Sequence, residues 1–145
     1  MHQPASVLLI DDSPGECELF ELALAASGIP ATIALEQDPQ VALLTLRNSP
    51  PRHLPSLILL DWKLGAGHGD RFLHALRGIP HLAVLPVVIF STSAEDQDVA
   101  AGYGAGATGY VQKPLTFDQL VLCIQDLCRY WLRRNLMPGM VKSPC

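Results

Sequence analysis

The feature that most limits the fold of this chain is a series of short apolar runs separated by stretches that suit helices. Each run is continuously apolar rather than alternating, which is typical of strands in a parallel sheet covered on both faces. The stretches between them are long enough for crossover helices. We therefore predict an α/β fold, a doubly wound five-stranded parallel sheet with helices on both faces. The predicted strands lie at 7–10, 31–35, 57–60, 87–90 and, more weakly, 109–111.

Helix signals in the sequence agree with this arrangement. Ser13, Pro14 and Glu16 form a capping box with proline at the first helical position, and Gly28 is placed to end the helix that they begin. Similar patterns predict four further helices, at about 38–47, 70–77, 94–102 and 116–134.

Nothing in the sequence divides it into separate units. Repeats and low-complexity segments are absent, and the stretch 48–55, which contains three prolines, indicates a loop rather than a linker between domains. We expect a single domain over residues 1–134, which includes an extended last helix, and a C-terminal tail over 135–145.

Composition narrows the class of protein. With 49% hydrophobic residues, the 145-residue chain can bury a core without metal or disulfide staples. A net charge of −4 and the lack of a basic run argue against nucleic-acid binding. The four cysteines lack the spacing of a zinc site or a secreted disulfide framework. The first apolar run is too short for a signal peptide or a membrane span. We therefore expect a cytoplasmic protein with no nucleic-acid or membrane partner.

Polar residues stand at the ends of four predicted strands. Asp11 and Asp12 directly follow the first strand, Asp61 ends the third, Ser91 ends the fourth and Lys113 follows the fifth. In open parallel sheets, ligands bind beyond the carboxyl ends of the strands, where the direction of winding reverses. We therefore expect these five side chains to meet at one edge of the sheet.

This cluster suits a metal and a phosphoryl group. Two unit charges about 4 Å apart repel each other by about 4 kcal/mol at an effective dielectric constant near 20, so three carboxylates need a cation between them. Lys113 offers one positive charge, but a hard divalent ion such as Mg²⁺ suits oxygen ligands better. With its charge screened, Asp61 can attack phosphorus to form an aspartyl phosphate, and Ser91 can donate a hydrogen bond to the phosphoryl oxygens. Taken singly, each residue has an ordinary explanation as a helix cap or surface charge; their joint placement favours a site.

These residues resemble those of the receiver domains of two-component response regulators. The resemblance runs from about Ser6 to Arg133 and rests on four segments, VLLIDDSPGE, LILLDWKL, PVVIFSTSA and GATGYVQKP. It implies the flavodoxin-like fold of the receiver type, a histidine kinase as phosphodonor and Asp61 as the phosphorylated residue. It also implies a signalling protein that slowly loses its phosphoryl group, rather than an enzyme.

The resemblance assigns the metal ligands by position. Asp12 and Asp61 resemble direct ligands of Mg²⁺, Asp11 a ligand that acts through a water, and Lys63 the residue whose backbone carbonyl completes the set. Two positions depart from the family's pattern. An acidic or amide residue is frequent at the position of His68, and proline is common at the position of Gly65. We leave His68 outside the site.

The same resemblance assigns the residues that respond to phosphorylation. Ser91 resembles the switch hydroxyl, Lys113 the cation that pairs with the phosphoryl group, and Tyr110 the aromatic that swings inward afterwards. The peptide bond between Lys113 and Pro114 resembles the family's cis bond. The side chains of Lys63 and Ser93 occupy positions that tune the access of the hydrolytic water.

The last helix suggests how the signal leaves the domain. Together with the loop at 48–55, it resembles the small regulators that partner phytochrome histidine kinases. Apolar residues surround more of this helix than one face, which favours a homodimer through it and adjoining elements; the alternative is that they cover a core edge or meet the tail. The core should bury Leu120, Ile124, Leu127 and Trp131, whereas Leu122, Cys123, Tyr130 and Leu132 lie off that stripe.

Other functions fit part of the pattern. A phosphorelay intermediate or a motor-binding regulator would use the same site. A metal-dependent phosphohydrolase also combines a strand-end aspartate with a metal, but a second acid–base aspartate two residues later would favour it, and position 63 is lysine. A flavodoxin-like binding module is disfavoured because three carboxylates would repel a phosphate-bearing ligand.

Overall fold

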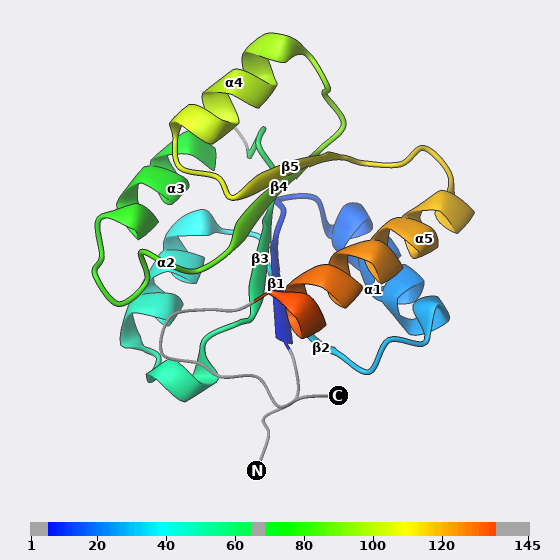
Figure 1. Ribbon diagram of the computed structural model, residues 1–145, viewed down its shortest axis with the longest axis horizontal. Coiled ribbons are helices and arrows are strands. Elements are labelled where there is room, and N and C mark those ends of the chain that lie inside the picture. Colours follow the sequence, from blue (N-terminus) through cyan, green and yellow to red (C-terminus); the bar gives the residue numbers. More distant parts are fainter. Residues whose placement is uncertain (1–5, 65–68, 136–145) are drawn as a thin grey trace.

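The computed structural model describes residues 6–64 and 69–135. Five parallel strands form one sheet in the order β2-β1-β3-β4-β5. The strands are β1 (Ser6–Ile10), β2 (Thr32–Glu36), β3 (Leu57–Leu60), β4 (Val87–Ser91) and β5 (Gly109–Gln112). The helices are α1 (Pro14–Ser27), α2 (Pro39–Asn48), α3 (Gly69–Arg77), α4 (Asp96–Gly104) and α5 (Phe117–Cys128), with short turns η1 (Pro51–His53) and η2 (Arg129–Arg134). Figure 1 shows the sheet between α1 and α5 on one side and α2, α3 and α4 on the other. The predicted doubly wound α/β fold is confirmed.

Two cores form because side chains alternate across the sheet. On the central strand β3, Ile58 and Leu60 join the cluster that packs under α2 and α3, whereas Leu57 and Leu59 join the cluster under α1 and α5. All four are at most 1% exposed. A strand buried on both faces has no position for a polar residue, which explains the continuous apolar run in the sequence.

The register of the strands brings the predicted site residues to one edge. Ile10 pairs with Leu60, and Leu60 pairs with Ile89. The residues that follow these strands therefore leave the sheet at the same level. Winding reverses between β1 and β3, which is where open α/β sheets bind their ligands.

The ends of α1 follow the predicted capping signals. The Ser13 hydroxyl accepts a hydrogen bond from the Glu16 backbone N–H at 3.3 Å. At the other end Gly28 adopts φ +73°, a left-handed conformation that glycine reaches without strain.

The last predicted helix, 116–134, is wrong in its final six residues. After Cys128 the chain continues as the π-helical turn η2 rather than as α-helix. In a π turn, the residues four and five positions after a given residue lie on the same side of the helix as that residue. Trp131 and Leu132 follow Leu127 at this spacing, and both pack against the core that contains Leu127. The helical pattern predicts Leu132 and Cys123 off the buried stripe, but both are partly buried against this core.

The peptide bond between Lys113 and Pro114 also differs from the expected one. Within the described residues every peptide bond is trans, this one included. Trans is the ordinary isomer before proline, favoured by about 0.5–1 kcal/mol.

Candidate functional site

Three carboxylates meet beyond the ends of β1 and β3. One carboxylate oxygen from each of Asp11, Asp12 and Asp61 lies within 4.8 Å of the others. Asp11 is 1% exposed, the Asp61 side chain is 15% exposed, and Asp12 lies at the surface. The cluster thus runs from the protein interior to solvent, with Asp61 accessible at its border.

Lys113 supplies a positive charge beneath the cluster. Its Nζ lies 2.9 Å from Asp11 Oδ2, 3.7 Å from Glu16 Oε2 and 4.0 Å from Asp61 Oδ1. Burial alone would lower the pKa of Lys113, but the hydrogen bond to Asp11 and the charges of Asp61, Asp11 and Glu16 raise the pKa above its ordinary value. Lys113 is therefore a permanent cation of the site.

One ammonium group does not neutralise three carboxylates. Burial raises the pKa of Asp61, and the charges of Asp11 and Asp12 raise it further, although Lys113 and the backbone N–H of Lys63 oppose them. The crowded donor set consists of carboxylate oxygens, which are the ligands that hard divalent cations prefer. These residues therefore fit a divalent metal ion.

Ser91 ends β4, and Tyr110 lies on the neighbouring strand β5, where it pairs with Ile89. Ser91 is 1% exposed, and its backbone carbonyl accepts a 2.7 Å hydrogen bond from the Lys113 N–H. The Tyr110 hydroxyl donates to the carbonyl of Ser93 at 2.9 Å, in the loop before α4. The structure thus places Ser91 directly beside the chain that carries Lys113, and Tyr110 against the loop that Ser91 begins.

Two acidic residues near the site were not predicted as part of it. The sequence indicates Glu16 only as part of a helix cap, yet its carboxylate lies close to Lys113. Asp98, in the first turn of α4, accepts a hydrogen bond from the Ser93 hydroxyl and lies 3.9 Å from Lys63 Nζ. Both stand in the first turn of a helix that follows a site strand, which is the sequence signal that points to them.

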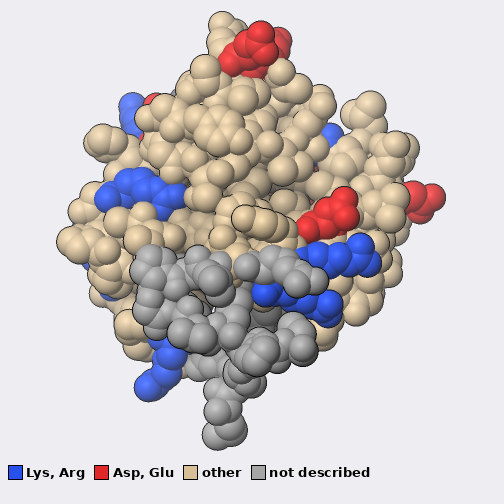
Figure 2. Space-filling model, viewed as in Figure 1, with Lys and Arg blue, Asp and Glu red and all other residues tan. Residues whose placement is uncertain are grey.

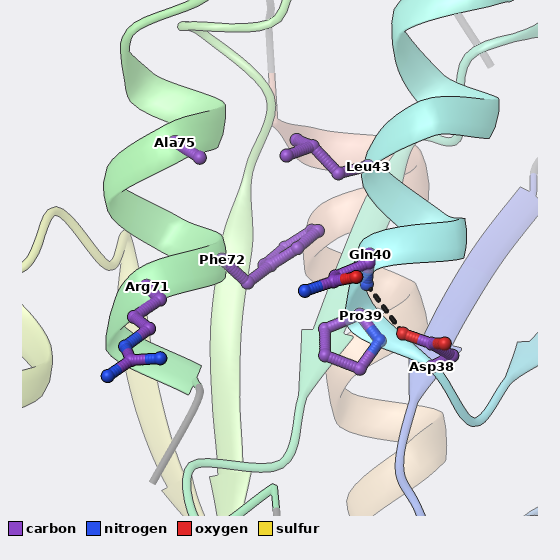
Figure 3. A pocket seen from close by; sticks show the side chains of 7 residues that line it. All are labelled: Asp38, Pro39, Gln40, Leu43, Arg71, Phe72 and Ala75. Carbon is purple, nitrogen blue, oxygen red and sulfur yellow. Dashed lines mark hydrogen bonds between the residues drawn. The ribbon is translucent and has the colours of Figure 1, made fainter.

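A separate pocket lies between α2 and α3, with a volume of about 490 Å³. Figure 3 shows Phe72 pointing from α3 toward Leu43 of α2. None of its lining residues belongs to the acidic cluster, so the chemistry of the cluster does not involve this pocket. The lining residues are Asp38, Pro39, Gln40, Leu43, Arg71, Phe72 and Ala75.

Some expectations fall outside the described part of the chain. Gly65 and His68 lie there, as does the tail from residue 136 onward. Within residues 6–64 and 69–135, no helix has the length and apolar character that a bilayer crossing requires.

Known proteins share this fold and this sequence pattern. A family model described as the response regulator receiver domain matches residues 7–125. The chain is 30% identical over 142 residues to the response regulator Rcp1 of Synechocystis, covering 94% of this chain and 95% of Rcp1. It is 31% identical over 138 residues to the probable methanogenesis regulatory protein FilR2 of Methanothrix harundinacea, covering 94% of this chain and 89% of FilR2.

Solved structures give the same result. The phosphorylated cyanobacterial phytochrome response regulator RcpA matches with a TM-score of 0.82 and 27% identity, covering 94% of this chain and 100% of RcpA. The Mn²⁺-bound form of Rcp1 matches with a TM-score of 0.77 and 28% identity over the same shares. Because the family match spans most of the sequence and includes every strand end that carries a site residue, the chain belongs to the family of response regulator receiver domains.

Proposed function

We propose that Asp61 of this receiver domain accepts a phosphoryl group from a histidine kinase, of the phytochrome type. The observation that carries the proposal is the cluster of the three carboxylates, two of which, Asp11 and Asp61, lie within 4.0 Å of the Lys113 ammonium group. Asp11 is engaged on both oxygens, since Oδ1 accepts from the Ser13 N–H and Oδ2 from Lys113. Asp61 lies next to the same ammonium group yet keeps 15% exposure, so a phosphodonor can reach it.

A divalent cation, Mg²⁺ in the cell, completes the proposed site. Asp12 and Asp61 would hold it directly, Asp11 through a water, and Lys63 through its backbone carbonyl. When bound, the ion neutralises carboxylate and phosphoryl oxygens that would otherwise repel each other. The Mn²⁺-bound form of Rcp1 supports a divalent ion in a relative of this chain.

The chain's own residues carry the transfer. An oxygen of Asp61 attacks phosphorus, the bond from phosphorus to the kinase imidazole breaks, and the imidazole keeps the electron pair. The acyl phosphate adds about −1.5 to −2 charges and three acceptor oxygens, toward which Lys113 and the Ser91 hydroxyl can turn. Tyr110 would give up its hydrogen bond to Ser93 and move inward. Slow hydrolysis then restores the carboxylate.

Incubation with acetyl phosphate followed by intact mass measurement tests this function. We expect the wild-type protein to gain one phosphoryl group in Mg²⁺ and none in EDTA, and Asp61→Asn to gain none in either. A label that survives unchanged in Asp61→Asn would show that another residue is the acceptor.

A homodimer through the last helix is the proposed output surface. In Figure 2 the area between α4 and α5 is largely without charged side chains, whereas acidic and basic groups lie over α5 and an acidic group lies at the end of α4. Leu122 of α5 is 59% exposed and Tyr130 is 53% exposed, beside a shallow groove that also includes Val111 of β5. Apolar side chains that the monomer leaves open on one face are the usual mark of a protein contact.

The exposure of Leu44 on α2 provides a matched control. Leu44 and Leu122 are both 59% exposed but lie on different faces of the molecule. We expect light scattering at micromolar concentration to give a dimer for the wild type and for Leu44→Glu, and a monomer for Leu122→Glu. A monomeric wild type, or equal dissociation by both substitutions, would contradict this interface.

The proposal assigns this activity to residues 1–134 and places the protein in the cytoplasm. Cys17, Cys123 and Cys128 are free thiols, which suits a reducing compartment.

A further inference from the structure

Asp98 connects the loop after the phosphoacceptor to the helix α4. Its carboxylate Oδ2 lies 3.9 Å from the ammonium of Lys63, in the loop that follows Asp61, and accepts the hydrogen bond of the Ser93 hydroxyl. The Ser93 oxygen in turn accepts a 3.2 Å hydrogen bond from the Glu95 N–H, just before α4 begins. One side chain thus joins the β3–α3 loop, the β4–α4 loop and the first turn of α4.

Few other contacts hold the helix α4 in place. Of its residues Asp96–Gly104, only Gly102 is buried. A Cβ at that position would lie 2.5 Å from Ile89 Cδ1 and 3.2 Å from the Tyr110 ring, so the helix approaches the sheet at one glycine. An element with few buried apolar contacts opens and shifts at a low free-energy cost. The polar contacts of Asp98 therefore carry much of the positioning of the first turn.

Phosphorylation of Asp61 would add negative charge close to Lys63. Its backbone N–H donates to Asp61 Oδ1 at 3.4 Å, so its side chain starts two residues from the proposed phosphoryl group. The side chain is 63% exposed, and an exposed ion pair with a single carboxylate is weak. A phosphoryl group with about −1.5 to −2 charges is a stronger partner than Asp98 with one.

We propose that Asp98 is a positioning residue that holds Lys63 and the first turn of α4 together until Asp61 is phosphorylated, when Lys63 exchanges Asp98 for the phosphoryl oxygens. The inference rests on the proposed phosphorylation of Asp61 and adds the device that carries the event to α4. Release of Lys63 removes the link between the β3–α3 loop and α4, and the first turn of α4 becomes free to shift.

Hydrogen–deuterium exchange of the segment 92–104, followed by mass spectrometry, tests the exchange of partners. In the wild type we expect phosphorylation with acetyl phosphate and Mg²⁺ to speed exchange in the first turn of α4 by about two- to five-fold, the size expected for loss of one exposed ion pair. Asp98→Asn and Lys63→Met should exchange at the faster rate before phosphorylation and change little after it. Lys63→Arg should behave like the wild type, because the cation is kept.

Asp96 provides the matched control, as an exposed acid in the same first turn of α4. Asp96→Asn should keep the full response to phosphorylation. Intact mass measured on each sample separates the two proposals. A wild-type protein that carries the label but shows unchanged exchange, or an Asp98→Asn variant that responds like the wild type, overturns the partner exchange alone. A wild-type protein that takes no label overturns the phosphorylation of Asp61, and this inference with it.

Discussion

Asp61→Asn should stabilise the metal-free protein although it removes the proposed phosphoacceptor. The substitution replaces one of three carboxylates whose oxygens lie within 4.8 Å of one another by a neutral group of nearly the same shape. The asparagine oxygen can still accept the 3.4 Å hydrogen bond from the Lys63 N–H. The main change is therefore the loss of one negative charge.

The size of the effect follows from the distances in the cluster. Asp61 and Asp11 oxygens lie within 4.8 Å of each other, and at an effective dielectric constant of about 20 two charges at that limit repel each other by about 3.5 kcal/mol. The attraction between Asp61 and Lys113 at 4.0 Å is about 4 kcal/mol on the same scale and offsets that repulsion. Two destabilising contributions of the Asp61 charge remain after these two cancel. They are the partial burial of Asp61 and its repulsion by Asp12, and solvent weakens the repulsion. We expect a net gain of about 1–2 kcal/mol in the free energy of unfolding.

The gain should depend on pH in a defined direction. Burial and the neighbouring carboxylates raise the pKa of Asp61 in the folded protein, so the protonated form favours folding. That stability is fully present below the pKa of the unfolded carboxyl, about 3.9, and is lost as the pH rises through the raised pKa of the folded state. The advantage of Asp61→Asn should therefore be small near pH 4 and grow toward pH 7.

Thermal unfolding in EDTA and in Mg²⁺ measures this effect. In EDTA at pH 7 we expect Asp61→Asn to melt about 3–8 °C above the wild type. Mg²⁺ at about 100 times its dissociation constant should stabilise the wild type by about 2.7 kcal/mol and the variant by less, so that the melting temperature of the wild type rises more and the difference between the two proteins shrinks. Asp96→Asn, an exposed acid outside the cluster, should leave both values within about 1 °C. A metal-free Asp61→Asn that is less stable than the wild type would refute the reasoning.

Two further substitutions test the supports of the site. Lys113→Met should cost about 3–5 kcal/mol, because it leaves the buried Asp11 without its cation, and a second substitution, Asp11→Asn, should recover part of the loss in urea unfolding; additive losses would contradict the pairing. Arg77→Met should cost about 3 kcal/mol, because the Arg77 guanidinium donates to three backbone carbonyls before β4 and after α4. Arg71→Met, which changes an exposed arginine of the same helix, should cost less than about 1 kcal/mol, and an equal cost would contradict this role.

The meeting of the site residues could be predicted because it depends only on strand ends. Asp11, Asp61 and Lys113 follow parallel strands, and the register of such strands brings their carboxyl ends to one level. The roles of Glu16 and Asp98 could not be predicted in the same way. They stand on helices, where the direction of a side chain depends on how the helix packs on the sheet, and that is decided by contacts distant in sequence.

The end of the last helix shows a second limit. Helical periodicity predicted one α-helix to residue 134, because a 3.6-residue repeat cannot distinguish an α turn from a π turn over so few residues. Packing decides the difference, since both Trp131 and Leu132 contact the same core. The Lys113–Pro114 bond is a third limit, because a resemblance to a family does not fix the isomer of a single peptide bond in this chain.

Calorimetric titration of the metal-free protein with Mg²⁺ tests the central claim most directly. If the crowded carboxylates require a divalent cation, one ion should bind per chain, and Asp12→Asn and Asp61→Asn should each weaken binding at least tenfold, the ratio that corresponds to about 1.4 kcal/mol. Absence of binding in the wild type would contradict the claim that these side chains hold the ion. Binding by both variants that is as strong as in the wild type would contradict it as well.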